Sequence, residues 1–239
     1  MAIKGILFDF NGTLFFDSEY HARAFELCCE KYGMPVFDRQ FMINNIFGRT
    51  NAEICMSHYI PNATEAQIEE FGKYKEKLYT DACIDNPTHL HLCEGVTEML
   101  DYLKKNSIPY CIATGSPIEN VEFYFEHLGL GKWFTMDNLV YCDGSFAGKP
   151  APDIYLLAAK RLGLDTSECA IFEDGTSGIL AARAAGAGKV IAVWEQGLPS
   201  PLNDEAQVDG VYHDFSEWKK IFAELGLINR SNNPSVSLR

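Results

Sequence analysis

The sequence has little positive charge. It contains 20 Lys and Arg residues against 33 Asp and Glu residues, which gives a formal net charge of -13. Nucleic acids and anionic membrane surfaces bind clusters of Lys and Arg, so this balance argues against both as partners. Because the overall negative charge repels anions, an anionic substrate would also need a local cluster of positive charge at its binding site.

Long apolar runs and paired-cysteine motifs are also missing. No stretch is long enough to span a bilayer, and no basic and apolar signal segment precedes the first strand-like run. The eight cysteines include no C-x-x-C pair, and their scattered spacing indicates buried free thiols in a reducing cytosol. We therefore expect a cytoplasmic protein. The sequence does not define an oligomeric state, so a monomer is the simplest expectation.

The patterns that are present predict an α/β fold. A chain of 239 residues can bury one substantial core together with a smaller second unit. Short β-rich runs alternate with amphipathic helical stretches, which predicts right-handed βαβ units and an open parallel sheet. The predicted strands cover residues 3–8, 110–113, 169–172 and 190–193.

Residues 17–89 interrupt this alternation with a helical insert. Helices are expected near 18–32, 38–46, 51–59 and 64–83. The predicted core then consists of residues 1–16 and 90–239. Its last stretch, 229–239, is polar and is expected to be a mobile tail.

Four polar clusters follow predicted strands or lie close beyond them. In a parallel sheet, ligands bind outside the carboxyl ends of the strands. Each cluster alone could be an ordinary turn or helix cap, but all four in this order are far more specific. They are Asp9-Phe10-Asn11-Gly12-Thr13, Thr114-Gly115-Ser116, Gly148-Lys149-Pro150 and Glu173-Asp174-Gly175.

Together these clusters resemble the four motifs of the haloacid dehalogenase (HAD) superfamily. The resemblance is closest to the subgroup of β-phosphoglucomutase and small phosphatases, in which a helical cap lies between the first two motifs. It implies a Rossmann-like three-layer core with a parallel sheet and an inserted small helical cap domain. It also implies a small phosphorylated metabolite as the substrate.

The resemblance assigns roles one residue at a time. Asp9 would attack phosphorus and form an aspartyl phosphate, Thr114 would hydrogen-bond a phosphate oxygen, and Lys149 would offset negative charge. Gly115 and Ser116 would contact the substrate. Mg²⁺ would be held by Asp9, Glu173, Asp174 and the backbone carbonyl of Asn11, all oxygen ligands of the kind that it prefers.

In the helical insert, His21, Arg49 and Lys75 resemble positions that touch substrate in relatives. A Gly-Arg turn at residues 48–49 suits bidentate recognition of phosphate. A lysine run such as 73, 75 and 77 is more often a solvated helix face, so Lys75 is open to both interpretations.

Asn11 departs from the pattern, because HAD phosphatases carry an Asp here as general acid and base. An amide cannot transfer that proton, and such catalysis is typically worth about 10²–10⁴-fold. The sequence therefore predicts a Mg²⁺-dependent phosphatase of small phosphoesters, slower than relatives that carry a carboxylate at this position. Three alternatives remain: a phosphate-binding protein with little or no turnover, a phosphonoacetaldehyde hydrolase-like enzyme, and a β-phosphoglucomutase-like mutase. Haloacid dehalogenation is disfavoured, since it needs no metal and Glu173-Asp174 indicates a cation.

Overall fold

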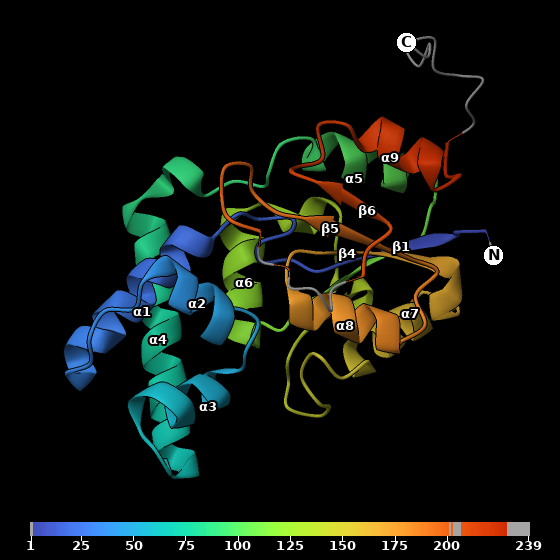
Figure 1. Cartoon of the computed structure of the whole chain (residues 1–239). Helices are drawn as coiled ribbons and strands as arrows, with labels where there is room; N and C mark the ends of the chain where they lie inside the picture. The colour runs from blue at the N-terminus through green and yellow to red at the C-terminus, as the bar shows by residue number, and fades with distance from the viewer. Residues whose placement is uncertain (1, 201, 203–206, 229–239) are drawn as a thin grey trace.

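The computed structural model describes residues 2–200, 202 and 207–228. Its centre is a six-stranded sheet with the order β3-β2-β1-β4-β5-β6, in which all neighbouring strands pair in parallel (Figure 1). The strands are β1 Gly5–Phe8, β2 Tyr110–Ala113, β3 Leu139–Val140, β4 Cys169–Glu173, β5 Lys189–Val193 and β6 Gly210–Tyr212.

Helices cover both faces of the sheet and make a three-layer core. Alternate strand residues point to opposite faces, so Ile6 and Phe8 pack into one apolar cluster and Leu7 packs into another. The first face is covered by α5 (Val96–Lys105), α6 (Ile118–His127) and α9 (Trp218–Glu224). The second is covered by α7 (Asp153–Arg161) and α8 (Thr176–Ala184).

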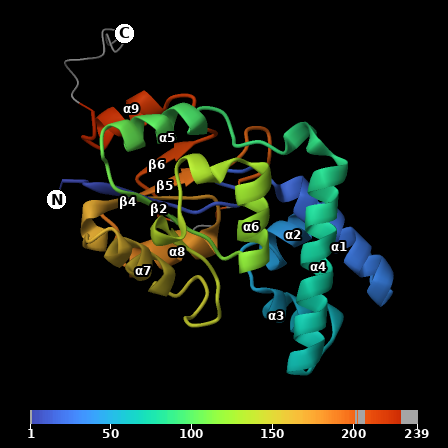
Figure 2. The ribbon, with the colours of Figure 1, turned by 180° about the vertical axis from the view of Figure 1, so that it is seen from behind.

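A helical region lies beyond the carboxyl ends of the strands, and α1 and α4 run side by side in both views (Figures 1 and 2). It has an apolar cluster of its own, to which Phe25, Met42, Tyr59 and Phe71 belong. Its helices are α1 Ser18–Tyr32, α2 Arg39–Asn45, α3 Asn51–Ile54, a π-helical turn Cys55–Tyr59, and α4 Glu65–Asp85.

Local sequence explains where these helices begin. Thr50 and Thr64 each form a capping box: the threonine hydroxyl accepts a hydrogen bond from the residue three positions later, whose side chain accepts from the threonine backbone. Each box satisfies two backbone N–H groups that a helix start would otherwise leave unpaired.

The predicted fold class and strands are confirmed, with two additions. The two-residue β3 and the three-residue β6 were not predicted, because runs this short carry too little alternation to recognise. The four predicted helices of the insert are present, except that residues 55–59 form a π-helical turn. The core and cap boundaries stay predictions, and the predicted tail lies outside the described residues.

Among the described residues, no helix is both long and apolar enough to cross a membrane. Seven of the eight cysteines are buried, which agrees with the prediction of buried thiols.

Candidate active site

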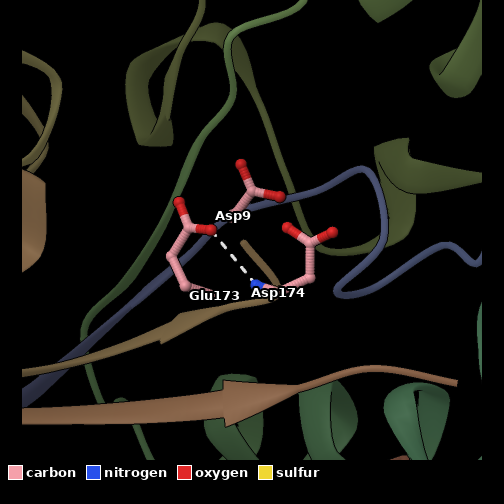
Figure 3. A group of neighbouring side chains, drawn as sticks. All are labelled: Asp9, Glu173 and Asp174. Atoms are coloured by element: carbon pink, nitrogen blue, oxygen red, sulfur yellow. Dashed lines mark hydrogen bonds between the residues drawn. The ribbon is translucent and has the colours of Figure 1, made fainter. Parts of the chain in front are cut away.

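Three carboxylates converge at the carboxyl ends of β1 and β4. Phe8 pairs with Phe172 across these strands, so Asp9 follows β1 at the level where Glu173 ends β4. Asp9, Glu173 and Asp174 each place a carboxylate oxygen within 4.8 Å of the others (Figure 3). Asp9 and Glu173 are buried, with 6% and 2% of their surfaces exposed, so these charges need compensation.

Lys149 supplies part of this compensation. Its Nζ lies 2.5 Å from Asp9 Oδ1 and 2.5 Å from Glu173 Oε1. The Tyr155 hydroxyl also donates a hydrogen bond to Glu173. Burial disfavours the ammonium ion, but the charges of Asp9 and Glu173 outweigh burial and raise the pKa of Lys149.

One lysine does not balance three carboxylates. Burial raises the pKa of Asp9 to about 7; Lys149 works against this shift and Glu173 adds to it. Burial, together with the charges of Asp9 and Glu173, raises the pKa of Asp174 well above its usual range. A divalent cation would remove this excess negative charge, and a set of carboxylate oxygens is what Mg²⁺ binds. The residues present therefore fit a Mg²⁺ ion.

Two glycines leave room for the carboxylates. A Cβ at Gly12, whose φ is +77°, would lie 2.1 Å from Asp174 Oδ2. A Cβ at Gly178 in α8 would lie 1.8 Å from Glu173 Oε1. Any larger residue at either position would have to displace a carboxylate of the site.

Asn11 is held on both sides of its amide group. Its Nδ2 donates to Asp17 Oδ2 at 2.5 Å and to the Tyr124 hydroxyl at 2.8 Å. Its Oδ1 accepts from Ser116 Oγ at 2.7 Å and from Thr114 Oγ1 at 3.3 Å. The first and second predicted clusters therefore meet at this amide.

Asp17, which immediately precedes α1, is a buried carboxylate in addition to Asp9 and Glu173. It accepts hydrogen bonds from Asn11 and, at 2.6 Å, from the Tyr79 hydroxyl, and His21 Nε2 lies 3.3 Å away. Burial alone would raise the pKa of Asp17, but His21, Tyr79 and Asn11 outweigh burial and lower it. His21 also stacks on the Tyr79 ring, with 4.2 Å between the ring centroids.

The other two residues predicted in the helical region differ from each other. Arg49 is exposed. Lys75 is 4% exposed and pairs with Glu76 at 3.0 Å, so its interpretation as part of a solvated face is wrong. Lys73 and Lys77 are the solvated members of that run, with side chains about 70% exposed. Lys75 differs from them because it faces α1, packing near the Phe25 ring.

The structure brings seven of the predicted residues together: Asp9, Asn11, Thr114, Ser116, Lys149, Glu173 and Asp174. Gly115 lies between Thr114 and Ser116, with open space where a Cβ would be. Four residues that hydrogen-bond to the predicted site residues were not predicted. Asp17, Tyr79 and Tyr124 contact Asn11, and Tyr155 contacts Glu173. The i, i+4 spacing of Lys75 and Tyr79 is the one sequence signal that could have pointed to Tyr79.

A small cavity of about 50 Å³ opens between the helical region and the loop after β5. Ile43 and Phe47 line it from one side and Trp194 and Leu198 from the other, and its wall also includes Asp17 and Asp174. The cavity therefore lies next to the carboxylate site, at the junction between the helical region and the core.

Known proteins are similar to this chain in sequence. Residues 3–186 match the family model described as haloacid dehalogenase-like hydrolase. The fructose-1-phosphate phosphatase YqaB of Escherichia coli is 31% identical over 182 residues, which cover 76% of this chain and 92% of that protein. The phosphorylated carbohydrates phosphatase of Thermotoga maritima is 28% identical over 193 residues, covering 80% and 85%.

A solved structure has a similar fold. A HAD hydrolase of family IA, variant 3, from Entamoeba histolytica superposes with a TM-score of 0.83 at 31% identity, covering 94% of this chain and 100% of that one. The chain therefore belongs to the haloacid dehalogenase-like hydrolase family.

Proposed function

We propose that the protein is a Mg²⁺-dependent phosphatase of small phosphoesters, with sugar phosphates as the first substrates to test. The observation that carries this proposal is the 2.5 Å contact between Asp9 and Lys149 beside the carboxylates of Glu173 and Asp174. The names of the relatives from Escherichia coli and Thermotoga maritima support the substrate class.

In the proposed reaction, a carboxylate oxygen of Asp9 attacks phosphorus, and the bond from phosphorus to the leaving oxygen breaks. Water then attacks the phosphorus of the aspartyl phosphate, which releases phosphate and restores Asp9. Lys149 offsets charge on Asp9 and the phosphoryl group, and Thr114 and Ser116 offer hydroxyl donors at the end of β2. A bound Mg²⁺ would neutralise phosphoryl charge, and Asp9, Glu173, Asp174 and the Asn11 carbonyl are the proposed ligands.

Asn11 takes the place of the usual acid and base in this proposal. Its amide cannot protonate a leaving group or activate water, so alkyl phosphates should react slowly. Aryl and acyl phosphates, whose leaving groups need little protonation, should react much faster. The aspartyl phosphate should also persist longer, since no carboxylate at position 11 activates the hydrolytic water.

The test is a panel of acyl, aryl and alkyl phosphates assayed with and without Mg²⁺, on the native protein and on Asp9→Asn. Turnover that needs both Mg²⁺ and Asp9 is the expected result. Equal rates on aryl and alkyl phosphates would contradict the leaving-group argument, and rates that Asp9→Asn leaves unchanged would contradict the nucleophile.

A second candidate is a phosphate-binding protein with little or no turnover. The hydrogen bonds of Asn11 favour this candidate. Asp17, Tyr124 and Ser116 fix its amide at both ends, which suits a residue that maintains the shape of a binding site rather than one that transfers protons. Binding of inorganic phosphate without hydrolysis of any ester in the panel would select this candidate.

A further inference from the structure

Tyr155 contacts two charged residues of the site with a single side chain. It is the third residue of α7 and is fully buried, with 0% of its surface exposed. Its hydroxyl donates a hydrogen bond to Glu173 Oε1, and the centre of its ring lies 5.3 Å from Lys149 Nζ. The ring therefore lies against the lysine that pairs with Asp9, and the hydroxyl reaches the carboxylate that shares this lysine.

The Tyr155 hydroxyl is not needed for packing. The residue belongs to the apolar cluster on the second face of the sheet, where a phenylalanine ring would fill the same space. A buried hydroxyl loses its contacts with water, and a hydrogen-bond partner in the protein must offset that cost. What the hydroxyl adds over a phenylalanine is therefore its contact with Glu173.

The Glu173 carboxylate is held at both of its oxygens. Oε1 accepts from the Tyr155 hydroxyl and from Lys149 Nζ, the latter at 2.5 Å. Oε2 accepts from the backbone N–H of Asp174 at 3.1 Å, drawn as a dashed line in Figure 3, and from that of Gly175 at 3.4 Å. Tyr155 therefore supplies a neutral donor at Oε1, from a helix outside the turn that carries the carboxylates.

The neutral donor matters for Lys149, because the charge of this lysine is shared. Its Nζ lies 2.5 Å from both Asp9 Oδ1 and Glu173 Oε1. A donor at Oε1 withdraws part of the negative charge that attracts the ammonium group to Glu173. Without the Tyr155 hydroxyl, Glu173 would attract Lys149 more strongly and could turn toward it. Lys149 would then offset less of the charge on Asp9 and on a phosphoryl group.

We propose that Tyr155 is a positioning residue for phosphoryl transfer: its hydroxyl fixes Glu173, so that Lys149 stays at Asp9 and the Glu173 carboxylate stays available to Mg²⁺. This rests on the proposed phosphatase function. Tyr155 does not touch the phosphoryl group and acts through Glu173. Hydrogen-bond partners of metal-ligating carboxylates typically contribute about 10–100-fold to metal affinity or activity, so the loss of this hydroxyl should be measurable.

The test compares the native protein with Tyr155→Phe, which removes the hydroxyl and keeps the ring. Calorimetry should show that the dissociation constant of Mg²⁺ rises about tenfold. On phenyl phosphate at saturating Mg²⁺, kcat should fall about tenfold and KM should change less than about twofold, because Lys149 stabilises charge that develops during the transfer. An unchanged Mg²⁺ dissociation constant in Tyr155→Phe would overturn the proposal.

Tyr110→Phe is the matched control, because it also removes a buried tyrosine hydroxyl. Tyr110 is the first residue of β2, away from the carboxyl ends of the strands, and its hydroxyl donates to the Trp133 carbonyl at 2.9 Å. This variant should change neither the Mg²⁺ dissociation constant nor kcat. If it weakened Mg²⁺ binding as much as Tyr155→Phe does, loss of any buried hydroxyl would explain the effect and the proposal would fail.

A double-mutant cycle tests whether Tyr155 acts through Glu173. In a Glu173→Gln background, Tyr155→Phe should change the Mg²⁺ dissociation constant less than about twofold, since the carboxylate that the hydroxyl fixes is gone. An effect of about tenfold in that background would show that the hydroxyl acts by another route, and would overturn the proposal. Mg²⁺ binding does not depend on turnover. A native protein that binds Mg²⁺ and hydrolyses no ester would therefore contradict the phosphatase function and leave this comparison intact.

Discussion

The side-chain nitrogen of Asn11 lies 2.5 Å from a carboxylate oxygen of Asp17. The residue that replaces the expected acid and base is thus hydrogen-bonded to a buried carboxylate, and that carboxylate immediately precedes α1 of the helical region. An aspartate at position 11 could not donate this hydrogen bond, and its negative charge would face that of Asp17. Proton transfer and local stability therefore make opposite demands on residue 11.

Asn11→Asp should raise the rate on alkyl phosphates, because it supplies a proton donor and acceptor. The increase should reach up to about 10²-fold, the lower end of what such catalysis contributes. The same variant should lose about 1–3 kcal/mol of unfolding free energy, because a buried donor to Asp17 is replaced by a like charge. Steady-state kinetics and urea unfolding measure the two effects. A gain equal on aryl and alkyl phosphates would show that proton transfer to the leaving group is not what Asn11 limits.

Lys149→Ala should leave the carboxylates of Asp9, Glu173 and Asp174 without their cation. Removing one partner of a buried ion pair typically costs about 3–5 kcal/mol, so the unfolding temperature should fall sharply and activity should be lost. Adding Mg²⁺ should recover part of the stability, since it supplies positive charge to the same oxygens. Lys160→Ala, an exposed lysine of α7, is the control and should change neither property.

Mg²⁺ should raise the unfolding temperature of the native protein in a concentration-dependent way, because an ion that binds only the folded chain stabilises it by mass action. At a concentration about 100 times the dissociation constant, the gain should be about 2.7 kcal/mol. Asp174→Asn should greatly weaken this response, whereas Asp137→Asn, at an exposed position, should preserve it. A full Mg²⁺ response in Asp174→Asn would place the cation elsewhere.

Asn11 precedes Gly12, and Asn-Gly sequences deamidate readily when the glycine nitrogen can attack the amide carbon. In the folded protein the Gly12 N–H donates to the Phe15 carbonyl at 2.8 Å, and the Asn11 amide is hydrogen-bonded at both ends. Deamidation should therefore be slow in the native state and fast in urea. Mass spectrometry of the peptide across residues 4–23 measures both rates. Equal rates would mean that these contacts do not restrain the residue, and that activity from deamidated chains must be subtracted in every assay.

The sequence predicts the parts of this molecule that repeat a pattern. The β-rich runs at residues 110–113 and 169–172 and the helices near 18–32 and 64–83 follow local rules of spacing, and the structure has them. Parallel strands also bring their carboxyl ends to one edge, which is why Asp9, Thr114 and Asp174 could be predicted to meet.

Contacts made by packing could not be predicted in this way. The i, i+4 spacing places Tyr79 on the same face of α4 as Lys75, but it does not show that the Tyr79 and Tyr124 hydroxyls reach Asn11, because that depends on how α4 and α6 lie against each other. The burial of Lys75 between exposed Lys73 and Lys77 is another such case. It depends on which side of α4 faces α1, and that side is defined by the tertiary structure rather than by the lysine spacing.

The close approach of Gly178 to Glu173 and of Gly12 to Asp174 means that the charge pattern of this site depends on two residues that carry no charge. A sequence could keep Asp9, Lys149, Glu173 and Asp174 and still be inactive if either glycine had acquired a side chain. When relatives are sorted into working enzymes and silent descendants, these two positions are therefore as informative as the acidic residues themselves.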